Sequence, residues 1–255
     1  MKNFVKGKIE KIEILSKYYL KLKVLLPYKK FSFQPGQFVM LSDKNSDITF
    51  SRPFSVLNWE GNYIEILIKM VGKFTKKISK IRENEEINIL GPLGNSFKKE
   101  ERVALVAGGY GIAPLYFYLK KGNNLKNIYI FYGGKTEKDI LLLEALKKLL
   151  KKENLFVGTE DGSLGEKGLI TDIFQKNLNK IKIEKVYGCG PLPMFKALKE
   201  ICNREKLDLY VSMDPIMACG YGVCLGCVIP TKNGNICACT EGPIFNSKEI
   251  LWDKL

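Results

Sequence analysis

The hydrophobic residues of this chain change their spacing near residue 100, and the two spacings require different folds. Before that point, apolar and polar residues alternate along 18–26 and 62–69, which is the period of a half-buried strand. The positions expected to face inward are Leu20, Leu22, Val24, Ile64, Ile66 and Ile68. Turn signals such as Pro35-Gly36 and Gly91-Pro92 separate the runs. Residues 1–98 are therefore predicted to form a small antiparallel β-barrel.

From residue 103 onward, strand patterns alternate with helix patterns. Strands are expected at 103–107, 127–132, 154–158, 185–188 and 207–211, and helices from Pro114 and around 138–151, 168–178 and 193–203. This alternation predicts a doubly wound parallel sheet over residues 99–212, so the chain as a whole combines β and α/β domains. A ligand of such a sheet lies beyond the carboxyl ends of its strands, where two glycine-rich loops, 108–111 and 188–190, fall.

A third region, 213–255, is defined by its cysteines. Cys219, Cys224, Cys227 and Cys239 follow the pattern C-x4-C-x2-C…C, and the whole chain contains no histidine. Thiolates at this spacing are typical of a [2Fe–2S] cluster, and the lack of histidine excludes a Rieske centre, a histidine-ligated haem and a Cys2His2 zinc site. A four-cysteine zinc site is the alternative, but such sites usually contain two C-x2-C pairs. The region is too small to fold without its cofactor.

The fourth ligand of this site is ambiguous from spacing alone. Cys237 and Cys239 lie two residues apart, and either thiolate could complete the set. The choice between them requires further information.

Composition restricts the class of partner and the compartment. The net charge is +14, but acidic residues are interspersed among the lysines, as in 76–86, which is typical of a solvated surface rather than a nucleic-acid patch. The cysteine distribution is unlike a disulfide scaffold and favours a reducing cytoplasm. Residues 1–15 lack the apolar run of a signal peptide, and glycines interrupt the uncharged stretch 103–119. We therefore expect neither nucleic-acid binding nor membrane insertion.

Two motifs indicate nucleotide cofactors. In Arg52-Pro53-Phe54-Ser55, the proline restricts the backbone, the guanidinium can bind phosphate through two hydrogen bonds, and the hydroxyl can add another. Together with 35–41, 71–75 and 91–97, this motif resembles the flavin-binding barrel of the ferredoxin–NADP reductase superfamily, in which the arginine motif binds FAD.

The loop 108–114, between a strand and a helix, suits a pyrophosphate. The segment 187–191 resembles the nicotinamide-side loop of the same superfamily. The NAD residues expected from these loops are Gly108, Gly109, Gly111, Cys189, Gly190 and Pro191.

The order of barrel, nucleotide domain and cysteine-rich segment resembles one family over essentially the whole chain, the electron-transfer subunits of class B dihydroorotate dehydrogenase. The segments MACGYGVCLGCV and CTEGPIF carry the resemblance most specifically. It implies that Cys219, Cys224, Cys227 and Cys239 are the cluster ligands. It also implies an FAD site formed by Arg52, Pro53, Phe54, Ser55, Leu67, Ile68, Lys69, Phe74 and Thr75. Three positions depart from the family pattern, namely Lys69 for arginine, and Phe74 and Tyr110 for glycine.

The resemblance implies a converter between two-electron and one-electron transfer. Hydride would pass between NAD(H) and FAD, and single electrons between FAD and the cluster. A separate FMN-containing subunit, in a heterotetramer with two copies of each chain, would oxidise dihydroorotate for pyrimidine biosynthesis. Two alternatives remain open, the flavin and iron–sulfur subunit of a soluble hydrogenase or anaerobic sulfite reductase, and a zinc-stabilised nucleic-acid-binding module.

Overall fold

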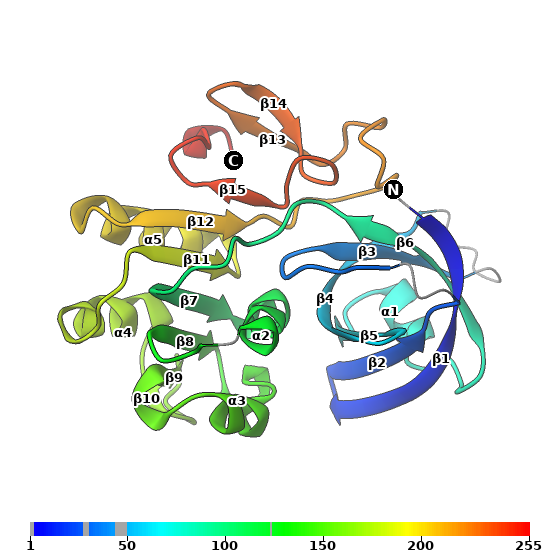
Figure 1. Cartoon of the computed structure of the whole chain (residues 1–255), viewed down its shortest axis with the longest axis horizontal. Coiled ribbons are helices and arrows are strands. Elements are labelled where there is room, and N and C mark those ends of the chain that lie inside the picture. Colours follow the sequence, from blue (N-terminus) through cyan, green and yellow to red (C-terminus); the bar gives the residue numbers. More distant parts are fainter. Residues whose placement is uncertain (1–2, 28–30, 44–49, 123) are drawn as a thin grey trace.

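The computed structural model describes residues 3–27, 31–43, 50–122 and 124–255. The first unit is a closed antiparallel barrel with strand order β1-β2-β5-β4-β3-β6, on the right of Figure 1. Its elements are β1 (Asn3–Ser16), β2 (Tyr19–Leu25), β3 (Phe38–Ser42), β4 (Arg52–Glu60), β5 (Tyr63–Lys69), α1 (Lys73–Ile78) and β6 (Glu86–Leu93). All six inward positions predicted from the alternation are fully buried, which confirms the strand periodicity.

The second unit is a parallel sheet covered on both faces. Its elements are β7 (Val103–Gly108), α2 (Ile112–Lys121), β8 (Ile128–Gly134), α3 (Leu143–Leu149), β9 (Leu155–Thr159), β10 (Glu166–Lys167), α4 (Ile170–Asn177), β11 (Lys185–Cys189), α5 (Leu192–Arg204) and β12 (Asp208–Ser212). The strand order is β10-β9-β8-β7-β11-β12. Side chains of α2 and α3 pack on one face, and those of α4 and α5 on the other. The predicted doubly wound fold is confirmed.

One predicted helix is shorter than the sequence pattern indicated. Residues 137–139 form a 3-10 turn, η2 (Glu137–Asp139), capped by the Thr136 side chain. Leu142 then adopts a left-handed conformation with φ of 58°, so α3 begins only at Leu143. The apolar pattern alone could not locate this break, because it depends on the backbone conformation of a single leucine.

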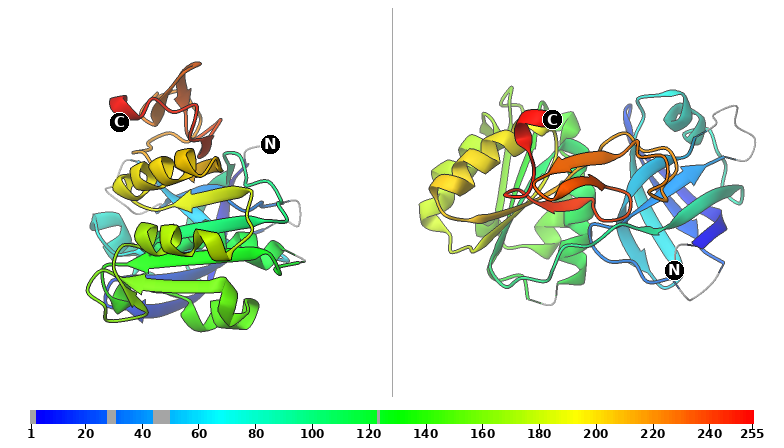
Figure 2. Two further views of the ribbon diagram at one scale, coloured as in Figure 1. Left: turned by 90° about the vertical axis from the view of Figure 1, so that its left-hand side faces the viewer. Right: turned by 90° about the horizontal axis from the view of Figure 1, so that it is seen from above.

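The C-terminal segment lies across the junction of the other two units, as Figure 2 shows from above. It contains a hairpin of β13 (Val228–Thr231) and β14 (Gly234–Cys237), followed by β15 (Ile244–Asn246). β15 pairs antiparallel with β12 and becomes the seventh strand of the nucleotide sheet.

Asn95 connects the barrel to this segment. Its side-chain amide donates to the carbonyl oxygens of Glu241 at 2.7 Å and Ile244 at 2.8 Å, and its Oδ1 accepts from the N–H of Ile244 at 3.0 Å. The backbone N–H of Asn95 also donates to the carbonyl of Gly242 at 2.6 Å. These bonds satisfy backbone groups of a segment that has little regular structure of its own.

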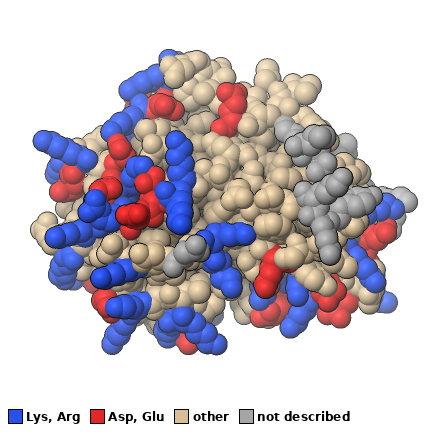
Figure 3. Space-filling view, in the orientation of Figure 1, with Lys and Arg blue, Asp and Glu red and all other residues tan. Residues whose placement is uncertain are grey.

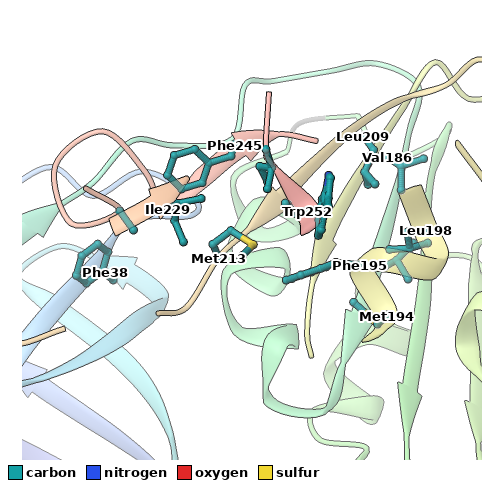
Figure 4. Packing of buried hydrophobic residues seen from close by; sticks show 14 of the residues in the cluster. Phe38, Val186, Met194, Phe195, Leu198, Leu209, Met213, Ile229, Phe245 and Trp252 are labelled. Atoms are coloured by element: carbon teal, nitrogen blue, oxygen red, sulfur yellow. The ribbon is translucent and has the colours of Figure 1, made fainter. Parts of the chain in front are cut away.

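One hydrophobic cluster joins all three units. Figure 4 shows Met213, Ile229 and Phe245 of the C-terminal segment between Phe38 of the barrel and Phe195 of α5. Each of these five side chains is at most 8% exposed. The C-terminal segment therefore completes its core by packing against both neighbours.

The charges on the surface are mixed in sign. Lys and Arg are interspersed with Asp and Glu on the face drawn in Figure 3, and several form ion pairs, such as Lys248 with Asp208 at 2.6 Å. Within the part of the chain that the structure describes, no helix combines the length and the apolar character needed to cross a membrane.

Candidate functional site

A cavity of about 1020 Å³ opens between the barrel and the nucleotide unit, with the start of the C-terminal segment at its edge. Almost every residue predicted to bind FAD or NAD lines it. They are Arg52, Pro53, Phe54, Ser55, Leu67, Lys69, Phe74, Thr75, Gly108, Gly109, Gly111, Cys189, Gly190 and Pro191. Ile68 is the exception, because the residue is fully buried in the barrel core and does not line the cavity. Two motifs that lie more than fifty residues apart thus form opposite walls of one site.

The barrel wall begins with the arginine motif, which forms the first part of β4 rather than a loop between strands. Arg52 pairs with Leu41, and its Nη1 donates to the carbonyls of Phe50 at 2.8 Å and Ser51 at 3.2 Å. These bonds hold the exposed guanidinium at the cavity, and its other N–H groups have no partner within residues 3–27, 31–43, 50–122 and 124–255. A guanidinium held in this way suits a phosphate ligand.

The second part of the barrel wall is the turn before α1. The Thr75 hydroxyl oxygen accepts hydrogen bonds from the N–H groups of Val71 at 3.0 Å and Gly72 at 3.1 Å, so it fixes the turn. The Phe74 ring packs on Phe54 with centroids 6.2 Å apart and is only 4% exposed. The phenylalanine at this glycine position of the family therefore packs into the wall and leaves the cavity open.

Lys69 connects the two walls. Its Nζ lies 5.4 Å from the ring centroid of Tyr19 in the barrel and 5.8 Å from that of Tyr110 in the glycine loop. Tyr19 in turn donates its hydroxyl to Asp139 Oδ1 of the nucleotide unit at 3.0 Å. Burial, followed by the contact with this carboxylate, raises the pKa of Tyr19, so the phenol stays protonated.

The nucleotide wall depends on close approach of two backbones. A Cβ on Gly111 would lie 2.2 Å from the Cys189 carbonyl oxygen, and one on Gly108 would lie 2.8 Å from Cδ of Pro191. Gly109 adopts a left-handed φ of 53°. The 3-10 turn η1 (Gly109–Gly111) leads directly into α2, whose N-terminal N–H groups favour a negatively charged ligand. The arrangement fits a dinucleotide pyrophosphate.

Cys189 lies at the carboxyl end of β11 and faces the cavity. Burial, and secondly the charge of Asp214, raises the pKa of this thiol to about 12, although a hydrogen bond with Ser212 opposes the shift. The thiol therefore stays neutral at physiological pH and is a poor nucleophile.

The cysteine segment has the donors that a cluster needs. Cys227, Cys237 and Cys239 are buried, Cys219 is half-buried, and Cys224 is exposed. Gly220 and Gly222, both with positive φ, let the chain turn sharply between Cys219 and Cys224.

Backbone N–H groups point toward the first of these sulfurs. The N–H of Tyr221 donates to Cys219 Sγ at 3.3 Å. Burial alone would raise the pKa of Cys219, but hydrogen bonds from Cys224, Tyr221 and Val223 lower it to about 6. A thiolate favoured in this way suits a positively charged iron centre, so the donor set fits the predicted cluster.

The structure brings both candidates for the fourth ligand near Cys227. Cys239 interacts with Cys227 and Cys219, and burial raises its pKa to about 12. Cys237 also lies beside Cys227, and its Sγ is 4.0 Å from the Gly222 carbonyl oxygen. β14 ends at Cys237 and Cys239 lies in the following turn, so the two do not share a strand face. In the described residues, no group of three candidate ligands is arranged around one metal position.

Some cavity residues were not anticipated from the sequence. Tyr19, Asp139, Glu160 and Asp214 all line the site, although none belongs to a cofactor motif. Tyr19 lies on the opposite face of its strand from Leu20, Leu22 and Val24, so the alternation gave no signal for it. The three acidic residues lie outside any recognisable spacing pattern.

Three family models together match most of the chain. They describe an oxidoreductase FAD-binding domain over residues 6–97, an oxidoreductase NAD-binding domain over 105–200, and the iron–sulfur cluster binding domain of dihydroorotate dehydrogenase B over 214–251. The chain is 39% identical to the electron transfer subunit of dihydroorotate dehydrogenase B (NAD(+)) from Clostridium acetobutylicum, over 87% of this chain and 88% of that relative. The Clostridium perfringens subunit is 36% identical over 97% and 98%. The chain belongs to this family of electron transfer subunits.

Solved structures show the same fold. A chain of the NADH-dependent reduced ferredoxin–NADP oxidoreductase, studied for flavin-based electron bifurcation, superposes with a TM-score of 0.86 at 28% identity, over 98% of this chain and 91% of that one. The cytochrome b5 reductase domain of Ulva prolifera nitrate reductase shares the fold, with a TM-score of 0.66 at 18% identity over 78% and 93% of the two chains.

As a member of the dihydroorotate dehydrogenase B electron transfer family, the chain is an NAD-linked flavin and iron–sulfur oxidoreductase subunit. Its FAD-binding, NAD-binding and cluster-binding domains confirm the predicted cofactors. Bound FAD supplies both hydride exchange and single-electron transfer. The residues of this chain position the dinucleotides, shape the cavity between them and hold the cluster segment beside it. The nucleic-acid-binding alternative does not fit a chain with three oxidoreductase domains.

Proposed function

We propose that this chain transfers electrons between a separate FMN-containing subunit, which oxidises dihydroorotate to orotate, and NAD+, as part of UMP synthesis in the cytoplasm. The observation that carries the proposal is the single cavity with a flavin-type wall, a nucleotide-type wall and the cysteine segment at its edge. The names of the relatives, which describe an electron transfer subunit, favour a catalytic partner. Two copies of each subunit would form the working heterotetramer.

The site assignments follow the two walls of the cavity. FAD would occupy the barrel wall, with Arg52 at its pyrophosphate, and the nicotinamide of NAD would approach Cys189 from the nucleotide wall. Cys219, Cys224, Cys227 and Cys239 would hold the cluster. The three domains would comprise residues 1–98, 99–212 and 213–255, with β15 of the third inserted at the edge of the second domain's sheet.

The partner would dock on an apolar patch around the exposed ligand Cys224. Ile216 is 89% exposed, Val223 80%, Leu225 63% and Tyr221 50%, and all lie within ten residues of one another. Exposed side chains of this size in one segment are typical of a protein interface. Electrons from the partner would enter the cluster directly at this edge.

The division of labour can be tested with the isolated chain. Loaded with FAD and cluster, it should pass electrons from NADH to an artificial dye but should not oxidise dihydroorotate. Addition of the FMN subunit should restore dihydroorotate-dependent NADH formation. Oxidation of dihydroorotate by this chain alone would refute the proposal. Co-purification with a hydrogenase or sulfite reductase subunit from the native cell would favour the alternative assembly.

Two substitutions test the assignments separately. Arg52→Ala should weaken FAD retention by roughly one to two decades, because a charge-assisted bond to phosphate contributes about 1.5–3 kcal/mol.

Val223→Asp should abolish co-purification with the FMN subunit and leave NADH-to-dye activity intact. Ile14→Asp is the matched control, because Ile14 is 59% exposed on β1 of the barrel. Equal loss of the complex in both variants would place the interface elsewhere.

A further inference from the structure

The proposed function leaves one proton to be accounted for, and the following inference rests on that function. A hydride carries two electrons and one proton, whereas an iron–sulfur cluster passes single electrons without protons. Each NADH formed from electrons that arrive through the cluster therefore requires one proton from solvent, and the reverse flow releases one. The chain has no histidine, which is the side chain that usually exchanges protons near neutral pH. Another group must carry the proton.

Three acidic side chains line the cavity, and two of them are poorly suited to this task. Asp139 is engaged by the Tyr19 hydroxyl at 3.0 Å and by the N–H of Thr136 at 3.3 Å. These bonds occupy both oxygens of its carboxylate. Glu160 follows β9, and its backbone N–H bonds to the Gly134 carbonyl at 3.0 Å, so it belongs to the side of the cavity away from Cys189 and the cluster segment.

Asp214 occupies a different position. It follows β12 in the link between the nucleotide sheet and the cysteine segment, and the backbone there is anchored by a hydrogen bond from the Met213 N–H to the Pro243 carbonyl at 2.8 Å. Its side chain is open to the cavity, and its charge acts on Cys189 and Tyr110. Among the described residues, its carboxylate has no hydrogen-bond donor or cation as a partner.

We propose that Asp214 carries the proton between solvent and the hydride-transfer end of the cavity. Its carboxylate would accept the proton when reduced flavin gives up its electrons one at a time, and would return the proton when flavin gains electrons one at a time. Electrons and protons then balance, because two electrons cross the cluster and one proton crosses Asp214 for each hydride exchanged with the nicotinamide.

The chemistry of the neighbouring groups supports this assignment. Desolvation by the cavity walls raises the pKa of Asp214, although its side chain remains exposed to the cavity, and a raised pKa suits a group that must both gain and lose a proton. The titratable groups that face it, Cys189 on β11 and Tyr110 on η1, have pKa values raised further from neutral by burial, so both keep their protons. The cation Lys69 lies 5.8 Å from the centroid of the Tyr110 ring.

The test separates hydride transfer from the proton-coupled step. Reduction of bound FAD by NADH moves a hydride and needs no proton carrier, so Asp214→Asn should keep this rate within about twofold in stopped-flow measurements. Reoxidation of the reduced flavin by a one-electron dye must release the proton and should slow about 100-fold, the lower end of general acid–base effects. In the parent chain this rate should rise with pH through one ionisation, and the variant should lose that ionisation.

Two further measurements exclude a purely structural role. Added acetate or imidazole should restore reoxidation in Asp214→Asn, because a free base can replace the missing carboxylate, and Asp214→Glu should retain most of the rate. In the cofactor-free chain, infrared difference spectra of parent against variant should contain the carbonyl band of a protonated carboxylic acid that titrates above the ordinary aspartate range. Asp253→Asn, an exposed substitution of the same type, should change none of these results.

The outcomes distinguish the two proposals. If Asp214→Asn reoxidises as fast as the parent, or slows both half-reactions equally without rescue by added base, the role of Asp214 is wrong while the proposed function stands. If the parent chain neither holds FAD nor passes electrons from NADH to a dye, the proposed function itself fails.

Discussion

The barrel and the C-terminal segment reach stability in opposite ways. The barrel closes its six-stranded sheet on itself and fills the interior with its own side chains, such as Leu20, Leu22 and Ile66. The C-terminal segment has a single two-stranded hairpin, places β15 in a sheet that belongs to another unit, and shares its hydrophobic cluster with both neighbours. The barrel should therefore fold without any metal, whereas the cysteine segment depends on docking and on its cluster.

The largest expected effect comes from loss of the fourth cluster ligand. Cys239→Ala should remove the iron and its visible charge-transfer bands and should unfold the hairpin segment. NADH-to-dye activity through FAD should be largely preserved, because the barrel and the nucleotide wall form without the segment's cysteines. Iron analysis, the absorption spectrum and the dye assay check the three parts of this prediction.

Cys237→Ala is the matched control for that experiment. It removes a thiol that also lies beside Cys227 and is similarly buried. The variant should keep both iron and dye activity. If iron is lost with Cys237→Ala and kept with Cys239→Ala, the assignment is wrong. If either variant also abolishes dye activity, the contrast between an independent barrel and a dependent segment fails.

A smaller effect is expected where the barrel meets the segment. Asn95→Ala removes three side-chain hydrogen bonds to Glu241 and Ile244 and should weaken docking by about 2–4 kcal/mol, since each such bond contributes about 1 kcal/mol. Hydrogen exchange should accelerate for amides of β15 and leave those of β3 and β5 unchanged. Uniform acceleration across the barrel would show that the two regions unfold together.

The close contact between the nucleotide loops predicts a more local effect. In Gly111→Ala, the new methyl would lie 2.2 Å from the Cys189 carbonyl oxygen, so the loops must separate. We expect the KM for NADH to rise about tenfold, equivalent to about 1.4 kcal/mol, with FAD retention unchanged. Gly109→Ala serves as the comparison, because its methyl meets open space and costs about 1–2 kcal/mol of backbone strain without the clash. A similar KM in both variants would attribute the effect to strain.

The sequence predicted the barrel and the nucleotide unit because each has a regular hydrophobic period. The alternation in β2 and β5 and the strand–helix succession after Val103 are both local signals, and the structure confirms them. The insertion of β15 beside β12 was not predictable in this way. It is a three-residue strand whose partner precedes it by more than thirty residues, so only tertiary packing selects the pairing.

The candidate site likewise contains some residues that local sequence signals identified and others that only the fold brings together. Motif residues such as Arg52 and Gly108 were identified because cofactor phosphates demand particular side chains and backbone conformations. Asp139 and Asp214 were missed, since their importance depends on neighbours that the fold supplies, namely Tyr19 for the first and Cys189 for the second. A carboxylate without a fixed spacing has no signal in a single sequence.

The last expected effect appears only at alkaline pH and concerns Cys202, a thiol outside the cluster segment. Cys202 is 1% exposed on α5, and burial raises its pKa to about 12. The folded state thus binds this proton more tightly than the unfolded state, in which the thiol titrates near 8.5. Its contribution to stability is complete below that pH and is lost as the pH rises toward 12, by at most about 1.4 kcal/mol per pH unit.

In urea unfolding of the cluster-loaded chain, Cys202→Ala should be somewhat less stable at pH 7, because it leaves a small cavity, but should lose less stability than the parent between pH 9 and 11. Parallel alkaline losses in the two chains would instead assign the effect to the buried tyrosines Tyr132 and Tyr187, whose pKa values are also raised by burial.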